Sequence, residues 1–182
     1  MGSRRLPRRI SARYLENAAL FHLGKYACSV QGLRRVLLRK VERSLKVHGG
    51  EKDIAVGWVE ALLLRFERSG YLDDQRFAHS KAGSLQRRGS STRHIQMQLR
   101  VKGVAPQLAA ESVEALLEEG VPPDWVAAVA YARRRRLGPF RKTALGGRAA
   151  RQKEFAAFAR KGFPFSLAKK IVDASDAEAL VF

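Results

Sequence analysis

The sequence has 182 residues, a formal net charge of +18 at pH 7 and 46% hydrophobic residues, enough to build a folded core. No apolar run approaches the roughly 20 residues of a membrane-spanning helix, which excludes a transmembrane protein. The single cysteine, Cys28, cannot form an internal disulfide, and the basic N-terminus lacks an apolar secretory segment, so we expect a cytoplasmic protein. The excess of positive charge favours a polyanionic partner, with nucleic acid ahead of an anionic membrane.

The N-terminal region predicts an arm followed by two helices. Residues 1–10 contain Pro7 and four arginines and leave little to bury, so they are expected to form a disordered basic arm. Ser11 and Ser29 are N-cap candidates, and apolar residues at helical spacing follow each of them. Residues 44–53 contain two glycines and are expected to be a linker before the next helix.

The stretch from Gly70 to Ala78 predicts a sharp corner between two helices. Before it, an apolar stripe made by Ile54, Trp58, Leu62 and Phe66 indicates one face of a helix. Gly70 tolerates the positive φ of a helix end, and the two apolar residues after it can fold back onto the closing turn. The corner comprises Gly70, Tyr71, Leu72, Asp73, Asp74, Arg76, Phe77 and Ala78, and Phe77, Lys81 and Leu85 are expected on the inner face of the helix that follows.

The two adjacent aspartates of this corner have two interpretations. Neighbouring carboxylates can bind a divalent metal or act as an acid and base pair. However, neighbours on a helix point about 100° apart, and no third ligand lies nearby in the sequence. We therefore interpret Asp73 as the N-cap of the next helix and Asp74 as negative charge in its first turn.

The rest of the chain is typical of a series of helices separated by glycine, proline and serine. Arg87–Ser91 is a basic turn that ends in N-cap serines, Pro106 fits a helix start, and Asp124 is expected to cap another helix. That helix runs into Arg133–Arg136 and breaks at Gly138-Pro139. The apolar residues that mark these helices include Ile95, Leu99, Leu108, Val113, Trp125, Val129, Phe155, Phe158, Leu167 and Ile171. No stretch alternates with period two for long, so no sheet is expected.

A short motif recurs along the chain and predicts repeated units. Leu99-x-x-Lys102-Gly103-Val104 returns as Phe158-x-x-Lys161-Gly162-Phe163. A weaker copy ends in Lys40-Val41, so the first unit is expected to have a different turn there or one continuous helix. Trp58 and Trp125 are interpreted as opening the first helices of the second and third units.

The predicted fold is therefore all-α, with about nine helices in three tandem three-helix repeats that form an elongated array able to curve. The expected boundaries are a disordered arm at 1–10, repeat one at 11–48, repeat two with its preceding linker at 49–120, repeat three at 121–175 and a tail at 176–182.

Catalysis, metal binding and cofactor binding find no support in the sequence. The four histidines share no metal-ligand spacing, and Cys28 lies six residues from His22 with no third partner. Gly146-Gly147-Arg148 is too short for a phosphate-binding loop and lacks a preceding strand. We therefore expect no enzyme and no cofactor.

Basic residues on the predicted helices are the candidates for contacts with nucleic acid or with a filament on it. Each charge run can instead be a solvated helix face, and part of Arg133–Arg136 can simply favour the negative end of the helix dipole. Four consecutive arginines cover most of a helix circumference, which favours the binding interpretation for that run. The candidates are Arg34, Arg35, Arg39, Arg87, Arg88, Arg93, Arg133, Arg134, Arg135, Arg136, Arg141, Lys142, Arg148 and Arg151.

These features resemble the RecX family, regulatory proteins that bind the recombinase RecA. The Gly70–Ala78 corner is similar to the strongest signature of that family. The turns at 102–104 and 161–163, with Gly103 and Gly162, resemble its later repeats, and Tyr14-Leu15 with the Arg34–Lys40 helix resembles its first. The resemblance covers roughly residues 11 to 175, and Val41 and the 44–53 linker depart from the usual pattern.

The resemblance implies an all-helical, three-repeat protein that lies in the groove of the RecA filament on DNA. There it would restrain RecA ATPase, strand exchange and co-protease activity, and so act in DNA repair, recombination and the SOS response. We expect a monomer that contacts single-stranded DNA either directly or through the filament. It supplies no catalytic residues. The alternative is a general helical nucleic-acid-binding protein without a RecA partner, and a small enzyme with a hidden site is a further rival.

Overall fold

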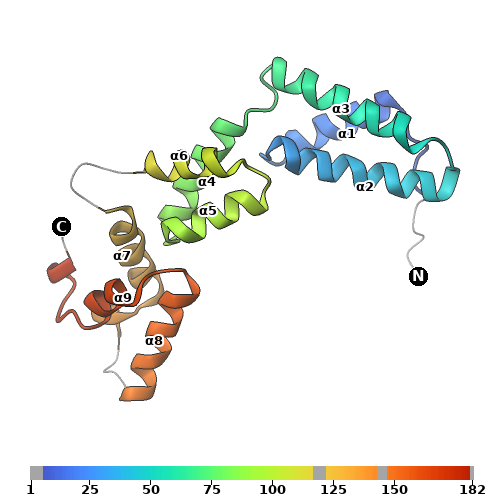
Figure 1. The fold of residues 1–182 in the computed structure, drawn as a ribbon. Coiled ribbons are helices and arrows are strands. Elements are labelled where there is room, and N and C mark those ends of the chain that lie inside the picture. The colour runs from blue at the N-terminus through green and yellow to red at the C-terminus, as the bar shows by residue number, and fades with distance from the viewer. Residues whose placement is uncertain (1–5, 117–121, 143–146, 181–182) are drawn as a thin grey trace. The chain divides into compact units, whose positions relative to one another are not determined.

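The computed structural model describes residues 6–116, 122–142 and 147–180. Within these residues the chain forms nine α-helices, two short 3-10 turns and no strand (Figure 1), which confirms the predicted all-α fold. The helices are α1 (Ala12–Leu23), α2 (Val30–His48), α3 (Lys52–Arg68), α4 (Asp74–Arg87), α5 (Thr92–Val101), α6 (Pro106–Glu114), α7 (Pro123–Arg135), α8 (Arg148–Arg160) and α9 (Phe165–Val172), and the 3-10 turns are η1 (Gly138–Phe140) and η2 (Glu178–Leu180).

Contacts divide the chain into two compact units. The N-terminal unit comprises Met1–Phe77 together with Lys102–Val104, and the C-terminal unit comprises Ala78–Val101 together with Ala105–Phe182. Each unit has its own hydrophobic core.

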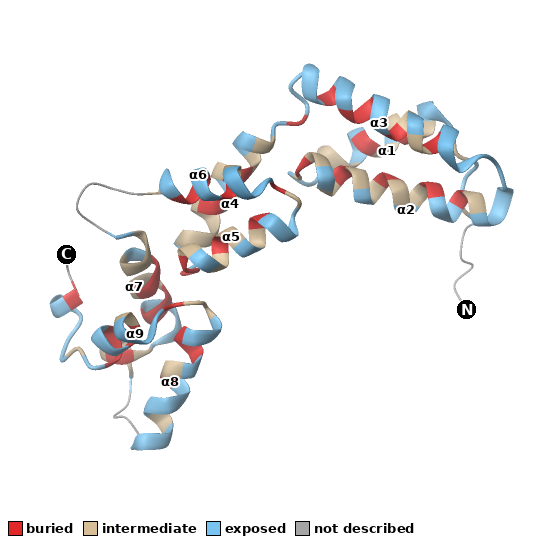
Figure 2. Cartoon of the chain, in the orientation of Figure 1, coloured by how far each residue is buried: buried red, intermediate tan, exposed pale blue. Residues whose placement is uncertain are grey.

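The N-terminal unit is a three-helix group in which α1, α2 and α3 all contact one another. Its core contains fully buried leucines and valines at helical spacing, and α2 supplies Leu33, Leu37 and Val41. Figure 2 shows buried residues along α1, α2 and α3. Ser29 caps α2 by accepting a hydrogen bond from the Gly32 N–H at 2.9 Å, and the helix ends at Gly49 with a φ of 66°. Because Val41 lies inside this helix, the weak copy of the repeated motif is continuous helix, one of the two alternatives predicted.

The helix α3 closes this first group, which differs from the predicted boundaries. The sequence pattern predicted a division between repeat one and repeat two after residue 48 and a linker at 44–53. The structure reduces the linker to residues 49–51 and packs α3 into the same core as α1 and α2. Trp58 therefore lies in the third helix of the first group, so its interpretation as the counterpart of Trp125, which lies in α7, is wrong.

The residues before α1 contact α2 instead of standing free. The His48 Nε2 atom donates to the Pro7 carbonyl at 2.7 Å, and the Ile10 N–H donates to Ser44 Oγ at 2.9 Å. Of the predicted disordered arm, residues 1–5 lie outside the described residues, whereas residues 7–10 have a defined place. In the predicted tail, Leu180 is buried in the C-terminal core, and residues 181–182 lie outside the described residues.

The corner at Gly70–Ala78 has the predicted construction. Gly70 has a φ of 73°, and the Leu72 N–H donates to the Phe66 carbonyl at 3.1 Å, which folds the buried Leu72 back onto the end of α3. Asp73 caps α4 by accepting from the Arg76 N–H at 2.8 Å. Tyr71 is exposed, but its ring lies 5.2 Å from the ring of Phe66.

Two faces near the corner are rotated relative to the prediction. Ile54 is exposed, because the buried face of α3 is formed by Ala55, Val59, Leu62, Leu63 and Phe66. The buried residues of α4 are Ala78 and Ala82, and the residues expected on its inner face, Phe77, Lys81 and Leu85, are only half-buried. Because small alanines occupy the core positions of α4, the large apolar side chains in the sequence mark the neighbouring positions instead.

In the C-terminal unit, α5 contacts α6, and α9 contacts α7, α8 and η1. Phe158 of α8 is fully buried, and its ring meets the ring of Tyr131 of α7 edge-on at 5.4 Å. The predicted cap at Asp124 is wrong. Pro122 holds the N-cap position of α7, and Asp124 lies in the first turn, where its carboxylate serves another helix.

Candidate nucleic-acid interface

Several of the candidate arginines are bound to carboxylates of the same chain. Arg34 forms an ion pair with Glu60 at 2.7 Å, and Arg151 binds both carboxylate oxygens of Asp173. Arg141 is held by Glu154 in the same way. These three side chains are therefore occupied within the molecule, which supports the alternative that a basic residue of this chain can be structural.

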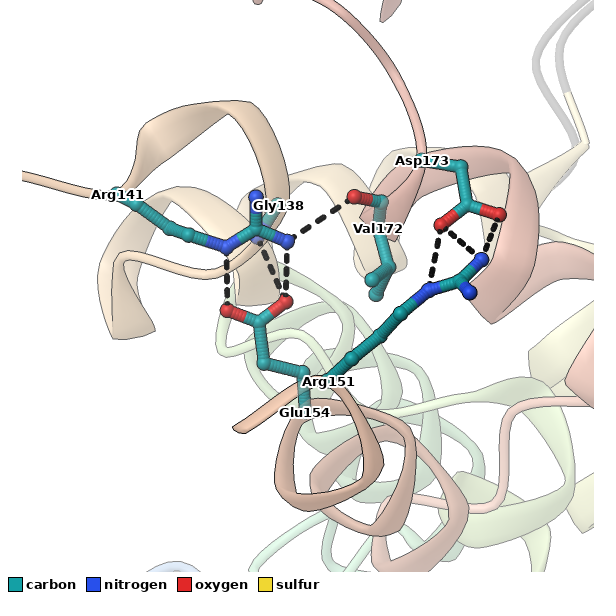
Figure 3. Close-up of polar contacts among 6 residues, drawn as sticks. All are labelled: Gly138, Arg141, Arg151, Glu154, Val172 and Asp173. Carbon is teal, nitrogen blue, oxygen red and sulfur yellow. Dashed lines mark hydrogen bonds and ion pairs between the residues drawn. The ribbon is translucent and has the colours of Figure 1, made fainter. Parts of the chain in front are cut away.

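Figure 3 shows the Arg141–Glu154 pair, and its side chains are less exposed than those of the other two pairs. The guanidinium donates to both carboxylate oxygens at 2.7 Å and also to the Val172 carbonyl at 3.0 Å. The Gly138 N–H donates to Glu154 Oε2 at 3.3 Å. The hydrogen bond to Glu154 is the main cause of the raised pKa of Arg141. The pair thus ties α8 to η1 and to the end of α9.

The run Arg133–Arg136 lies at the C-terminal end of α7, and all four residues are exposed. Three of them occupy the last turn, where positive charge complements the helix dipole. Arg136 adopts a left-handed conformation with a φ of 56°, and the Arg133 guanidinium lies 5.4 Å from the centre of the Phe140 ring. The run therefore combines exposed positive charge with a local role at the helix end.

Two matching sets of contacts, which we call joints, connect consecutive three-helix groups. In the first joint, Ser29 Oγ donates to the Lys102 carbonyl, and the Asp74 carboxylate accepts from the Val30 N–H at 2.8 Å. Gly103 has a φ of 89°, and a Cβ atom there would overlap Gln31 Cβ. All of these residues belong to the N-terminal unit.

The second joint repeats this pattern inside the C-terminal unit. Ser91 Oγ donates to the Lys161 carbonyl at 2.8 Å, and the Asp124 carboxylate accepts from the Thr92 N–H at 2.6 Å. Gly162 has a φ of 81°, and a Cβ atom there would overlap Ser91 Oγ. The repeated Lys-Gly turn is therefore a packing device, and Asp74 and Asp124 each cap a helix of the preceding group.

A basic groove lies beside the second joint, between α5 and the C-terminal end of α8. Its cavity volume is about 800 Å³. The lining includes three arginines, of which Arg93 is one of the predicted candidates and Arg100 and Arg160 are not. The lining residues are Arg93, His94, Met97, Arg100, Val101, Ala159, Arg160 and Gly162. No local signal in the sequence indicates that these arginines converge, because α5 and the end of α8 are far apart along the chain.

The other candidates are distributed over both units and are not drawn into this groove. Arg35 and Arg39 lie on α2, where each side chain donates to a backbone carbonyl one turn earlier. Arg87 and Arg88 are exposed at the end of α4, and Lys142 and Arg148 are exposed on either side of the undescribed residues 143–146.

Neither a metal centre nor a membrane span is found in the described part of the chain. Across residues 6–116, 122–142 and 147–180, no three His, Cys, Asp or Glu side chains are grouped so that they could hold a metal ion. None of the helices described combines the length and apolarity that crossing a bilayer requires.

Comparison with known proteins agrees with this architecture. A profile of the RecX family, describing its second three-helix domain, matches residues 73–113, which begin at Asp73 and contain α4, α5 and most of α6. The regulatory protein RecX of Myxococcus xanthus is 46% identical over 171 residues, covering 94% of this chain and 90% of the relative. The regulatory protein RecX of Agrobacterium fabrum is 32% identical over 166 residues, covering 91% of this chain and 85% of the relative. No solved structure matches the chain.

The joints and the three-helix groups define a protein of the helical-repeat class, in which neighbouring units are held by a recurring contact. Because two RecX proteins match nearly the whole chain, this chain belongs to the RecX family of regulatory proteins.

Proposed function

We propose that this protein binds RecA filaments on single-stranded DNA and restrains RecA ATPase, strand exchange and co-protease activity. The single observation that supports this most is the 46% identity to a regulatory protein RecX over 94% of the chain. A net charge of +18 provides the attraction that a filament of nucleic acid and protein requires. The proposal assigns the protein a cytoplasmic location and a regulatory role without catalysis, and it treats the protein as a monomer.

A protein whose contacts are distributed over repeated units can bind a filament well, because the filament presents the same surface many times along its length. Each bound unit raises the effective concentration of the next, so weak contacts add up to a stable complex. The candidate arginines occur in both units of the chain, and several of them are exposed. The alternative function, a general nucleic-acid binder without a RecA partner, is favoured by the charge alone.

The experiment that separates these functions is a pull-down with purified RecA filaments on single-stranded DNA, followed by a RecA ATPase titration. The wild-type protein should sediment with the filament and slow ATP hydrolysis in a saturable manner. DNA without RecA serves as the control for direct binding. Binding to both DNA samples alike, with no change of ATPase, would favour the general nucleic-acid binder.

A further inference from the structure

Three arginines give the groove between α5 and α8 a positively charged lining. Arg93, Arg100 and Arg160 belong to this lining, and of the residues that the structure describes no Asp or Glu does. Among the described residues, none of these three arginines forms an ion pair, in contrast to Arg34, Arg141 and Arg151. Gathering three such guanidinium groups costs free energy through their mutual repulsion, so an anion that bridges them would be bound favourably.

The same groove offers apolar surface beside the arginines. Met97 is 47% exposed, and Val101, one turn further along α5, is 59% exposed. A simple phosphate-binding site has no use for these side chains. A single-stranded nucleic acid has phosphates for guanidinium groups and unstacked sugar and base faces for apolar side chains.

The second joint fixes the floor of the groove. Gly162 lines the groove and packs against Ser91, whose Oγ accepts from the His94 N–H at 3.2 Å. The pKa of His94 is lowered by burial first and by Lys161 second, so its ring is neutral at pH 7. The positive charge that lines the groove at neutral pH therefore comes from the three arginines, while His94 can exchange neutral hydrogen bonds with a ligand.

An acidic protein segment is the competing occupant, and the geometry favours it less. A helical peptide in a groove needs apolar anchors over at least two turns, and an extended peptide needs an open sheet edge. This groove presents exposed apolar side chains at two positions on α5, and its walls are helices whose backbone groups are paired internally.

We propose that the α5–α8 groove binds a single nucleic-acid strand, with backbone phosphates on Arg93, Arg100 and Arg160 and with sugar or base faces against Met97 and Val101. This inference deepens the proposed function, because it assigns the DNA strand of the filament to one site on this chain. It can nevertheless be tested without RecA.

The test is fluorescence anisotropy of a labelled oligothymidylate with the full chain over a salt series. The groove variant combines Arg93→Gln, Arg100→Gln and Arg160→Gln, and the matched control combines Arg13→Gln, Arg43→Gln and Arg68→Gln, three exposed arginines outside the groove. Removing three arginines that bind single-strand phosphates should lower the slope of log affinity against log salt by about 2. The control variant should bind the strand more tightly than the groove variant does, and its salt slope should stay closer to that of the wild type. Circular dichroism should show equal helix content and melting for all three proteins.

A second variant, Met97→Ala, tests the apolar part of the groove. It should weaken strand binding at every salt concentration and leave the salt slope unchanged, because it removes apolar area but no charge. Equal slopes for the groove variant and the control would overturn the proposal. Polyglutamate tests the competing occupant. If it displaces the strand from the wild type, and if it binds the wild type and the control tightly but not the groove variant, the groove binds an acidic protein segment instead.

The RecA ATPase titration with the same variants distinguishes this inference from the proposed function. If the wild type slows RecA but the groove variant binds oligothymidylate as the control does, the groove inference alone fails. If the groove variant loses strand binding while the wild type leaves RecA unaffected, the inference stands and the filament function fails.

Discussion

At the scale of single residues, Glu154 is the most unusual side chain of the core. Glu154 lies eight residues before the glycine of the Lys-Gly turn in the last group. Ile95 has the same place in the middle group, and Leu33 has the same place relative to Val41 in the first group. A carboxylate at a core position needs a partner, and Arg141 supplies one with two hydrogen bonds. The last group therefore replaces an apolar core residue by a buried ion pair.

We predict that Glu154→Ala lowers the free energy of unfolding by about 2 to 3 kcal/mol, because it leaves a largely buried guanidinium without its partner. Denaturation by urea, followed by circular dichroism, measures the change. Asp173→Ala is the matched control, since it breaks the more exposed pair with Arg151 and should cost less than about 1 kcal/mol. Equal losses of stability for the two variants would mean that burial of the Glu154 pair contributes nothing special.

Asp74 gives a second prediction at this scale. Its pKa is raised above the ordinary 3.8, first by burial and then by the charge of Asp73, although the hydrogen bond from Val30 opposes the shift. The folded protein therefore binds the Asp74 proton more tightly than the unfolded chain does. This residue's contribution to stability should improve as the pH falls from neutral through the raised pKa towards 3.8.

The comparison of wild type with Asp74→Asn, each unfolded by urea at a series of pH values, isolates that contribution. The stability of the wild type relative to the variant should rise on acidification. If the wild type instead became less stable relative to the variant, the ionised carboxylate would be stabilised by the Val30 N–H more than burial disfavours it.

At the scale of elements, the helix ends show which features were predictable from the sequence. The caps Ser11, Ser29 and Asp73 were predicted correctly because each acts on backbone only three residues away. The joints were not predicted, because Ser29 and Ser91 reach carbonyls 73 and 70 residues further along the chain. A cap that acts within one helical turn can be predicted from the sequence, whereas a contact between residues so far apart along the chain is known only from the folded structure.

The repeated glycines illustrate the same division. The sequence indicated a turn at Gly103 and Gly162, but their contacts with the preceding group came only from the structure. Val41 replaces the glycine in the first group, where α2 simply continues and no joint is made among the described residues. A helix interior disfavours glycine, so an apolar β-branched residue fits this position better.

Replacing two positive-φ glycines, Gly70 and Gly103, by alanine gives a prediction of stability at the scale of elements. Gly70→Ala should cost about 1 to 2 kcal/mol, because the residue has positive φ but nothing within 4 Å of a new Cβ atom. Gly103→Ala should cost about 1 to 3 kcal/mol more, because it adds a clash with Gln31 to the same backbone strain. Thermal melting of both variants measures the difference, and equal melting temperatures would show that the joint yields without strain.

At the scale of the whole molecule, composition and charge predict a class of partner, a polyanion, but they cannot indicate which residues are available to it. The total of +18 and the basic helices indicated a polyanion. Which arginines are available could not be predicted, because their carboxylate partners are distant in sequence: Glu60 lies 26 residues from Arg34 and Asp173 lies 22 residues from Arg151. The boundary of the first group was also misplaced, because α3 has no sequence mark that assigns it to α1 and α2.

We predict that replacing Arg133, Arg134, Arg135 and Arg136 together by glutamine weakens binding to filaments on single-stranded DNA. The salt slope should fall by about 0.7 for each of these arginines that binds a phosphate in the wild type. Removing the entire last group should weaken binding further, because it also removes a tethered binding module. RecA ATPase titrations with these variants measure the effect. Inhibition by the quadruple variant equal to that by the wild type, at low and high salt, would show that the run is only a solvated helix end.

The joints also have a consequence for how such chains can grow. The middle group carries both halves of the joint, with Asp74 and Gly103 facing the preceding group and Ser91 and Thr92 facing the next. In the last group, Ala150 stands where Ser29 and Ser91 stand in the others, so the hydroxyl that would engage another group is missing. The middle group is thus an interchangeable module, and duplicating it in the gene would extend the chain by a unit that fits at both ends, whereas duplicating the last group would not.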